Sequence, residues 1–124
     1  HTNSAAGAVS RLSDLGVEPF LVASSLSGVM AQRLVRRVHR ECGGQGCNRC
    51  LGSGYLGRVG LFELLLCSAR VRELIATRNG ERLILEAARS GGMRTLREEG
   101  LRLAHEGLTT DAEVFRVTAT EDEP

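Results

Sequence analysis

The chain has 124 residues, of which 42% are hydrophobic and only 3% aromatic, so it is long enough for one modest domain or two small lobes with an aliphatic core. All 16 basic residues are arginine and the formal net charge is +1, so composition gives no argument for a nucleic-acid or anionic-membrane surface. No apolar run approaches the roughly 18–20 residues of a membrane span, and the N-terminus lacks a signal-peptide pattern. We therefore expect a cytosolic protein whose four cysteines are metal ligands or buried thiols rather than disulfides.

The first third of the chain predicts two helices and a strand. Apolar residues recur at helical spacing over 4–15 and stop at Gly16, a common helix C-cap. After a turn at 17–19, residues 20–29 favour a second short helix that ends at Gly28. The segment 31–38 predicts a strand with imperfect alternation of apolar residues and arginines.

A composition change marks the middle of the chain. Residues 41–60 hold seven glycines and three cysteines, which is too little apolar surface for a packed core. Residues 55–60 and 61–67 then predict two short strands around a glycine turn.

From Ser68 onward the pattern is helical. Asn79-Gly80 separates two helices, and Gly91-Gly92 ends the second of them. A third helix is expected over 93–105, interrupted by Gly100. Thr109 or Thr110 can cap a last helix, with Glu113 three residues after Thr110 completing a capping box.

The sharpest chemical signal is a set of four candidate metal ligands, His39, Cys42, Cys47 and Cys50. Their spacing, His-x2-Cys-x4-Cys-x2-Cys, gives two ligand pairs of the kind that hold tetrahedral Zn²⁺, and the intervening glycines supply the backbone freedom for tight turns. The alternative is a partly exposed Cys47–Cys50 dithiol with His39 as a solvated surface residue. Cys67 lies in an apolar run and is interpreted as a buried core thiol.

Several segments, in order, resemble the secretion ATPases of the type II secretion and type IV pilus family. They are His1–Ala6, Gly16–Leu26, Ala31–Arg36, Gly46–Cys50, Gly54–Gly60, Phe62–Leu65, Gly92–Leu96, Gly107–Thr110 and Glu113–Thr118. In that family four cysteines typically form the metal site, with a longer loop between the pairs. Here a histidine stands in the first pair, and histidine is also a competent zinc ligand.

The resemblance implies a mixed α/β fold. Residues 1–38 would be the helical end of a RecA-like ATPase core, 39–67 a metal-binding knuckle with a short β unit, 68–120 a C-terminal helical subdomain, and 121–124 a frayed tail. It also implies a hexameric cytoplasmic motor on the inner-membrane face that powers pseudopilus assembly in type II secretion. Its partners would be inner-membrane platform proteins, with no nucleic acid and no direct membrane association.

The resemblance also places nucleotide chemistry near a few residues. His1 matches the histidine box of the family, close to the γ-phosphate of ATP. Arg33 and Arg36 could reach a nucleotide phosphate or a neighbouring subunit, or could line a solvated strand face. The chain has no phosphate-binding loop and no lysine, so we expect ATP and Mg²⁺ binding only in a complete protein and no hydrolysis by this piece alone.

Three alternatives remain open from the sequence. The chain could belong to the pilus-extension branch of the same family. It could be a stand-alone zinc-knuckle module that binds protein or single-stranded RNA, although the shortage of aromatic residues disfavours RNA. It could be a redox protein that uses Cys47 and Cys50, although no helix N-terminus follows Cys47 to lower its pKa.

Overall fold

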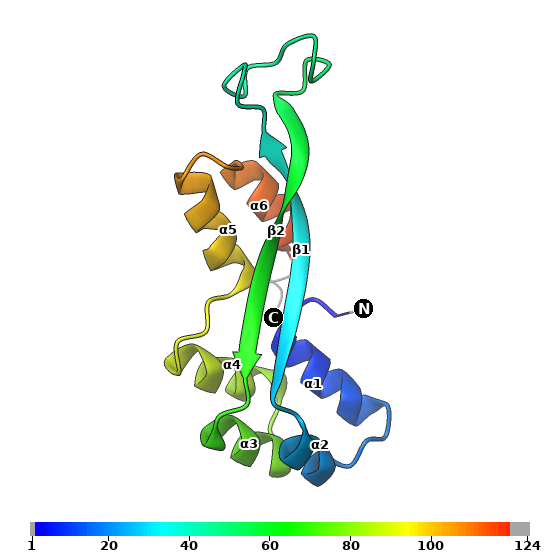
Figure 1. Cartoon of the computed structure of the whole chain (residues 1–124). Helices are drawn as coiled ribbons and strands as arrows, with labels where there is room; N and C mark the ends of the chain where they lie inside the picture. Colours follow the sequence, from blue (N-terminus) through cyan, green and yellow to red (C-terminus); the bar gives the residue numbers. More distant parts are fainter. Residues whose placement is uncertain (1, 120–124) are drawn as a thin grey trace. The chain divides into compact units, whose positions relative to one another are not determined.

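The computed structural model describes residues 2–119 and shows a small mixed α/β structure. Its helices are α1 (Ala5–Asp14), α2 (Pro19–Ser25), α3 (Ala69–Ala76), α4 (Glu81–Ser90), α5 (Leu96–His105) and α6 (Asp111–Val117), and its strands are β1 (Gly28–Val38) and β2 (Tyr55–Leu66) (Figure 1). The expected mixture of helices with a small β unit is confirmed at this level. Within the described part of the chain, no helix has the length and apolar content needed to cross a bilayer.

The two strands pair with each other in one sheet (Figure 1). Two backbone bonds set an antiparallel register, from the N–H of Cys67 to the carbonyl of Ser27 (3.0 Å) and from the N–H of His39 to the carbonyl of Gly54 (2.9 Å). Between these bonds the second segment has one residue more than the first, which indicates a β-bulge. Gly57 lies inside β2 with φ of +79°, the left-handed conformation that a glycine bulge uses.

The expectation of two short strands around a glycine turn at 55–67 is therefore wrong. β2 is one continuous strand from Tyr55 to Leu66. Its glycines read in sequence as a turn, but pairing along the whole of β1 keeps the chain extended, and the bulge absorbs the left-handed glycine.

One of two compact units comprises residues 1–31 and 62–95. In it α1 packs against α4, and α2 against α3. The helix predicted over 4–15 is confirmed: the Ser4 hydroxyl caps α1 by accepting the N–H of Gly7 (3.0 Å), and Gly16 follows its end with φ of +92°. The carboxylate of Glu63, only 1% exposed, accepts the N–H of Ala5 (2.7 Å) and so satisfies a donor at the start of α1.

The second helix is shorter than the sequence predicts. α2 ends at Ser25, and Leu26 is already extended, so Gly28 begins β1 instead of ending a helix. A side chain at Gly28 would lie 3.1 Å from the carbonyl oxygen of Leu65, which shows how closely β2 approaches. Strand pairing therefore outweighs the local helical pattern of this segment.

The other unit comprises residues 32–61 and 96–124, and within it α5 packs against α6. The third predicted helix begins at Leu96 rather than Met93, and Gly100 does not interrupt it. A Cβ built on Gly100 would lie 2.7 Å from Cγ1 of Val114 and 3.0 Å from Cδ1 of Leu61. Glycine is present because the side chains of α6 and β2 fill the space where a larger residue would project.

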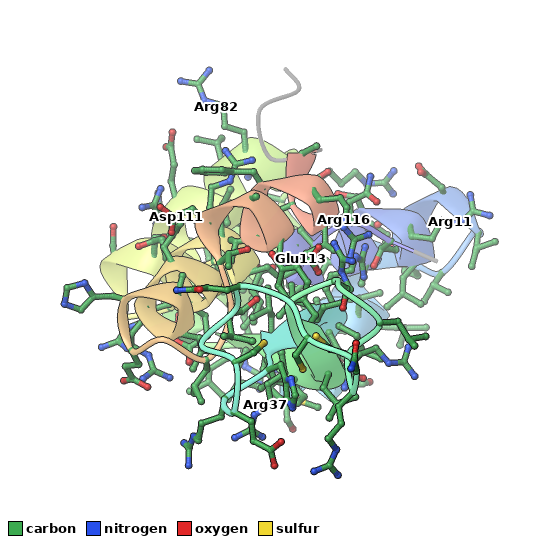
Figure 2. The ribbon with its side chains drawn as sticks, turned by 90° about the horizontal axis from the view of Figure 1, so that it is seen from above. Arg11, Arg37, Arg82, Asp111, Glu113 and Arg116 are labelled. Carbon is green, nitrogen blue, oxygen red and sulfur yellow. The ribbon has the colours of Figure 1, made fainter. Side chains whose placement is uncertain are left out.

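A buried carboxylate joins β1 to α6 in this unit. Thr110 caps α6 as predicted, since its hydroxyl accepts the N–H of Glu113 (3.3 Å). The side chain of Glu113, 2% exposed, does not complete a capping box. It accepts the backbone N–H of Arg36 (2.8 Å), the guanidinium of Arg36 (2.7 and 3.0 Å) and that of Arg116 (3.0 and 3.1 Å). Figure 2 shows Glu113 and Arg116 next to each other on α6.

Replacing Gly100 tests the packing of α5. Alanine is the better helix former by about 1 kcal/mol, yet we expect Gly100→Ala to lower the free energy of unfolding because its methyl group meets Val114 and Leu61. Urea denaturation followed by circular dichroism measures the change. Val114→Ala removes one of the colliding side chains, so the double variant should lose less than the two single variants together; strictly additive losses would contradict this packing.

The Glu113 network predicts a pH dependence of stability. Hydrogen bonds from Arg116 and then from Arg36 outweigh burial and lower the pKa of Glu113 from 4.5 to about 2. A carboxyl with a lowered folded-state pKa stabilises the fold above its unfolded pKa and loses that contribution as the pH falls toward the folded value. The free energy of unfolding should therefore fall between about pH 5 and pH 2.

The Glu113→Gln variant should be less stable by about 2 kcal/mol at neutral pH and should show a flatter profile in that window. Glu106→Gln, which alters a half-exposed ion pair with Arg102, is the matched control and should leave the profile close to that of the native chain. If the two variants showed the same dependence of unfolding free energy on pH, Glu113 would not be the cause of the loss of stability in acid.

Candidate metal centre

The four candidate ligands lie in the loop that joins β1 to β2 (Figure 1). This loop repeats one backbone turn twice, at an offset of eight residues. The N–H of Gly44 bonds the carbonyl of His39 (3.2 Å), and the N–H of Gly52 bonds the carbonyl of Cys47 (2.8 Å). The residue after the second ligand is left-handed in both turns, with φ of +62° at Gly43 and +55° at Leu51. Each turn thus presents its own pair of ligands in the same way.

Two glycines let the turns approach each other. Gly46 has φ of +102°, and a Cβ there would lie 2.7 Å from the carbonyl oxygen of Gly52. Gly54 is its equivalent eight residues later, and a Cβ there would collide with the carbonyl oxygen of Gly44. The short loop between the ligand pairs therefore closes because the second turn packs on the first through bare backbone.

The four side chains converge on one point. Their ligand atoms all lie within 4.8 Å of one another. Sγ of Cys47 lies 3.6 Å from Sγ of Cys50 and 3.3 Å from Nδ1 of His39, and the sulfur atoms of Cys42 and Cys50 are 3.9 Å apart. This arrangement can hold one metal ion between three sulfur atoms and one nitrogen.

Backbone amides point at the sulfur atoms. Burial opposes ionisation of Cys50, but the N–H groups of Gly54 (3.3 Å) and Cys47 (3.2 Å), together with His39, lower its pKa to about 5. Burial likewise opposes ionisation of Cys42, whose pKa is lowered by the N–H groups of Gly46 and Gly44. At Cys42 and Cys50 the site therefore favours negative sulfur, which is the form that binds metals. At Cys47 the N–H of Cys50 favours the thiolate, but burial and the neighbouring thiols outweigh it and raise the pKa.

The histidine belongs to this cluster and is not a solvated surface residue. Its side chain is 5% exposed. A hydrogen bond with Cys50 raises the pKa of His39 against the opposing effect of burial, and Cys42 contributes in the same direction. On the other side of the ring, Nε2 lies 3.8 Å from a carboxylate oxygen of Glu41, which Arg49 holds at 3.0 and 3.3 Å.

The loop is anchored in the unit that contains α6. The N–H of Val38 bonds the carbonyl of Leu108 (3.0 Å) beside the first ligand. After the last ligand, the hydroxyl of Tyr55 bonds that of Thr110 (2.7 Å), and the Arg36 guanidinium lies 4.3 Å from the centre of the Tyr55 ring. These anchors have no local signal in the sequence, since Thr110 is 55 residues from Tyr55.

The remaining candidates are not part of the cluster. Cys67 is 8% exposed, and burial raises its pKa, as expected of a core thiol. Arg36 is engaged by Glu113, and Arg33 donates to the carbonyl of Gln32 (2.8 Å). His1, the candidate neighbour of a γ-phosphate, and the tail at 121–124 lie outside the described residues.

Comparison with known proteins assigns the chain to a family. The sequence profile described as "Type II/IV secretion system protein" matches residues 1–116. Type II secretion system protein HxcR of Pseudomonas aeruginosa is 48% identical over 95% of the chain and 27% of its own length. Type II secretion system protein E of Pectobacterium carotovorum is 42% identical over 98% of the chain and 29% of its length.

The pilus branch is also represented. Type IV pilus assembly ATPase PilB of Thermus thermophilus is 40% identical over 95% of the chain and 16% of its own length. The chain thus spans less than a third of the length of each of these relatives. Because the family profile covers nearly all of its residues, the chain belongs to the type II/IV secretion system protein family.

Proposed function

We propose that the chain is the C-terminal portion of a hexameric cytoplasmic ATPase that powers type II protein secretion by driving pseudopilus assembly. The observation that carries this proposal is its 48% identity to HxcR along almost the whole chain. Residues 1–38 would close a RecA-like core, 39–67 would form the metal-binding subdomain, and 68–120 would pack against neighbouring subunits. The motor would act on platform proteins of the inner membrane, and it would meet the membrane only through them.

A pilus-assembly ATPase is the second candidate. It is supported by the 40% identity to PilB, which shows that the same segment occurs in both branches. Type II secretion is preferred because HxcR is more similar over the same share of the chain.

The metal of the cluster is proposed to be Zn²⁺, held by His39, Cys42, Cys47 and Cys50. Zn–S bonds of about 2.3 Å at tetrahedral angles place two sulfur atoms about 3.8 Å apart, and a Zn–N bond of about 2.0 Å places nitrogen about 3.5 Å from sulfur. The corresponding distances here are 3.6 and 3.9 Å between sulfur atoms and 3.3 Å between Nδ1 and sulfur. The donor set therefore fits zinc in its chemistry, these three distances fit its size, and all four ligand atoms lie within 4.8 Å of one another.

The proposed role of the ion is structural. Four protein ligands leave no open coordination position for a substrate. The loop has little apolar surface, and Leu51 at its second turn is 93% exposed, so hydrophobic burial contributes little to ordering it. Metal binding would supply that missing free energy and fix the loop against its anchors at Leu108 and Thr110.

A nucleotide or subunit contact is proposed for the arginines of β1. The guanidinium of Arg36 binds Glu113 yet is about half exposed, so it can still meet an anionic group. Arg33 lies nearby in sequence on β1 and is partly exposed. Their contact with ATP would require the remainder of the motor.

Metal analysis of the purified chain tests the zinc proposal. We expect about one zinc per chain. Cys50→Ser should bind substantially less, and amide hydrogen exchange of residues 39–54 should speed up when the native chain is treated with a chelator. Cys67→Ala removes a thiol outside the cluster and should keep the full zinc content. A native chain that is free of zinc and equally protected in chelator would exclude this role.

Exchange of segments tests the motor proposal. The chain replaces the matching segment of HxcR in P. aeruginosa, and we expect the chimaera to restore at least about a tenth of HxcR-dependent secretion, because the two segments are nearly half identical. The same replacement in a PilB protein should restore less pilus assembly. Rescue of piliation but not of secretion would assign the chain to the pilus branch, and rescue of neither would contradict a motor role.

A further inference from the structure

An ion pair links equivalent positions of the two ligand turns. Glu41 precedes Cys42 in the first turn, and Arg49 precedes Cys50 in the second, eight residues later. Nη1 of Arg49 donates to both carboxylate oxygens of Glu41, at 3.0 and 3.3 Å. The two side chains are 63% and 71% exposed, and an ion pair of that kind contributes little to stability. The ion pair lies beside the metal cluster, where its carboxylate can act on the His39 ligand.

A histidine ligand has a requirement that a cysteine ligand lacks. A thiolate binds through its only donor atom, whereas an imidazole has a second nitrogen that carries a proton and needs a partner. Nδ1 of His39 faces the thiols, 3.3 Å from Sγ of Cys47. Its Nε2 faces away from them and lies 3.8 Å from Oε2 of Glu41.

We propose that Glu41, held by Arg49, is a positioning residue for the metal: it accepts the Nε2 proton of His39 and so fixes Nδ1 as the ligand atom. This inference rests on the proposed zinc site. The present 3.8 Å separation is an ion-pair distance, and the proposed hydrogen bond requires the exposed Glu41 side chain to move closer to the ring. A carboxylate in this place also makes the ring more basic and strengthens its bond to the metal.

The pair thereby joins both turns to one ligand. The carboxylate comes from the first turn, and the arginine that orients it comes from the second. Closing the loop brings Arg49 to Glu41 and, through Glu41, sets the orientation of His39. A histidine ligand at position 39 can use such a carboxylate partner, whereas a cysteine ligand could not.

Zinc affinity, measured on the whole chain by competition with a chromophoric chelator at one fixed pH, tests the proposal. We expect Glu41→Gln to weaken zinc binding by at least about tenfold. Arg49→Gln should weaken it less, and its effect should shrink in the Glu41→Gln background because it acts through Glu41. Arg40→Gln changes an exposed charge next to His39 and serves as the matched control, with affinity unchanged.

The decisive comparison uses His39→Cys, which removes the second nitrogen. In that background Glu41→Gln should leave zinc affinity unchanged, and in the native background the Nε2 proton of the zinc-loaded chain should be protected in NMR spectra and lose its protection in Glu41→Gln. An equal loss of affinity in both backgrounds, or no loss in either, overturns the role of Glu41 while leaving the zinc site intact. Absence of zinc binding by both the native chain and His39→Cys overturns the zinc site itself.

Discussion

Pairing between β1 and β2 organises both compact units and the metal loop. Both units draw core residues from both strands: Ala31 and Leu65 are buried in one, and Val35 and Leu61 in the other. The same pairing brings His39 beside Gly54, so that the loop between them is closed at its base by a backbone bond. Without that bond the two ends of the glycine-rich loop would be free to separate, and bringing the first and last ligands together would cost more conformational entropy.

Within the closed loop, two copies of the same turn order the chain through backbone contacts, in place of the apolar packing that orders other parts of the molecule. Each turn uses a backbone bond around its ligand pair and a left-handed residue after it. Gly46 and Gly54 then allow carbonyl groups of the opposite turn to come closer than any side chain would permit. Backbone hydrogen bonds hold both turns of this loop, and its N–H groups favour thiolates at Cys42 and Cys50 and hence a cation.

Charge in this chain also serves a structural role. Glu113 is buried among donors from two arginines and one backbone amide, so its carboxylate is paired and hydrogen-bonded as a buried charge must be. Arg36 at the same time covers the Tyr55 ring, which connects α6 to the strand that leaves the metal loop. Arginine suits this position because its planar fork can bind a carboxylate at its edge and stack on a ring with its face.

Features that depend on near neighbours along the chain could be predicted from the residues alone. The spacing of His39, Cys42, Cys47 and Cys50 predicted a cluster that the structure brings together, and Gly16 and Thr110 were predicted at helix ends that the structure retains. These signals are local, because a helix cap, like a pair of metal ligands separated by two residues, involves only residues within one turn of the chain. The family resemblance was likewise carried by short blocks in a fixed order.

Other features depend on contacts between segments that are far apart along the chain. Glu113 fits a capping box by spacing, yet it binds Arg36, which lies 77 residues away along the chain. Gly100 looked like a break, but the packing of Val114 requires it. Gly57 was expected inside a short strand, yet it takes the left-handed conformation of a bulge in a longer one. The physical reason is the same in each case: contacts between distant segments are worth more than local preferences and leave no periodic trace in the sequence.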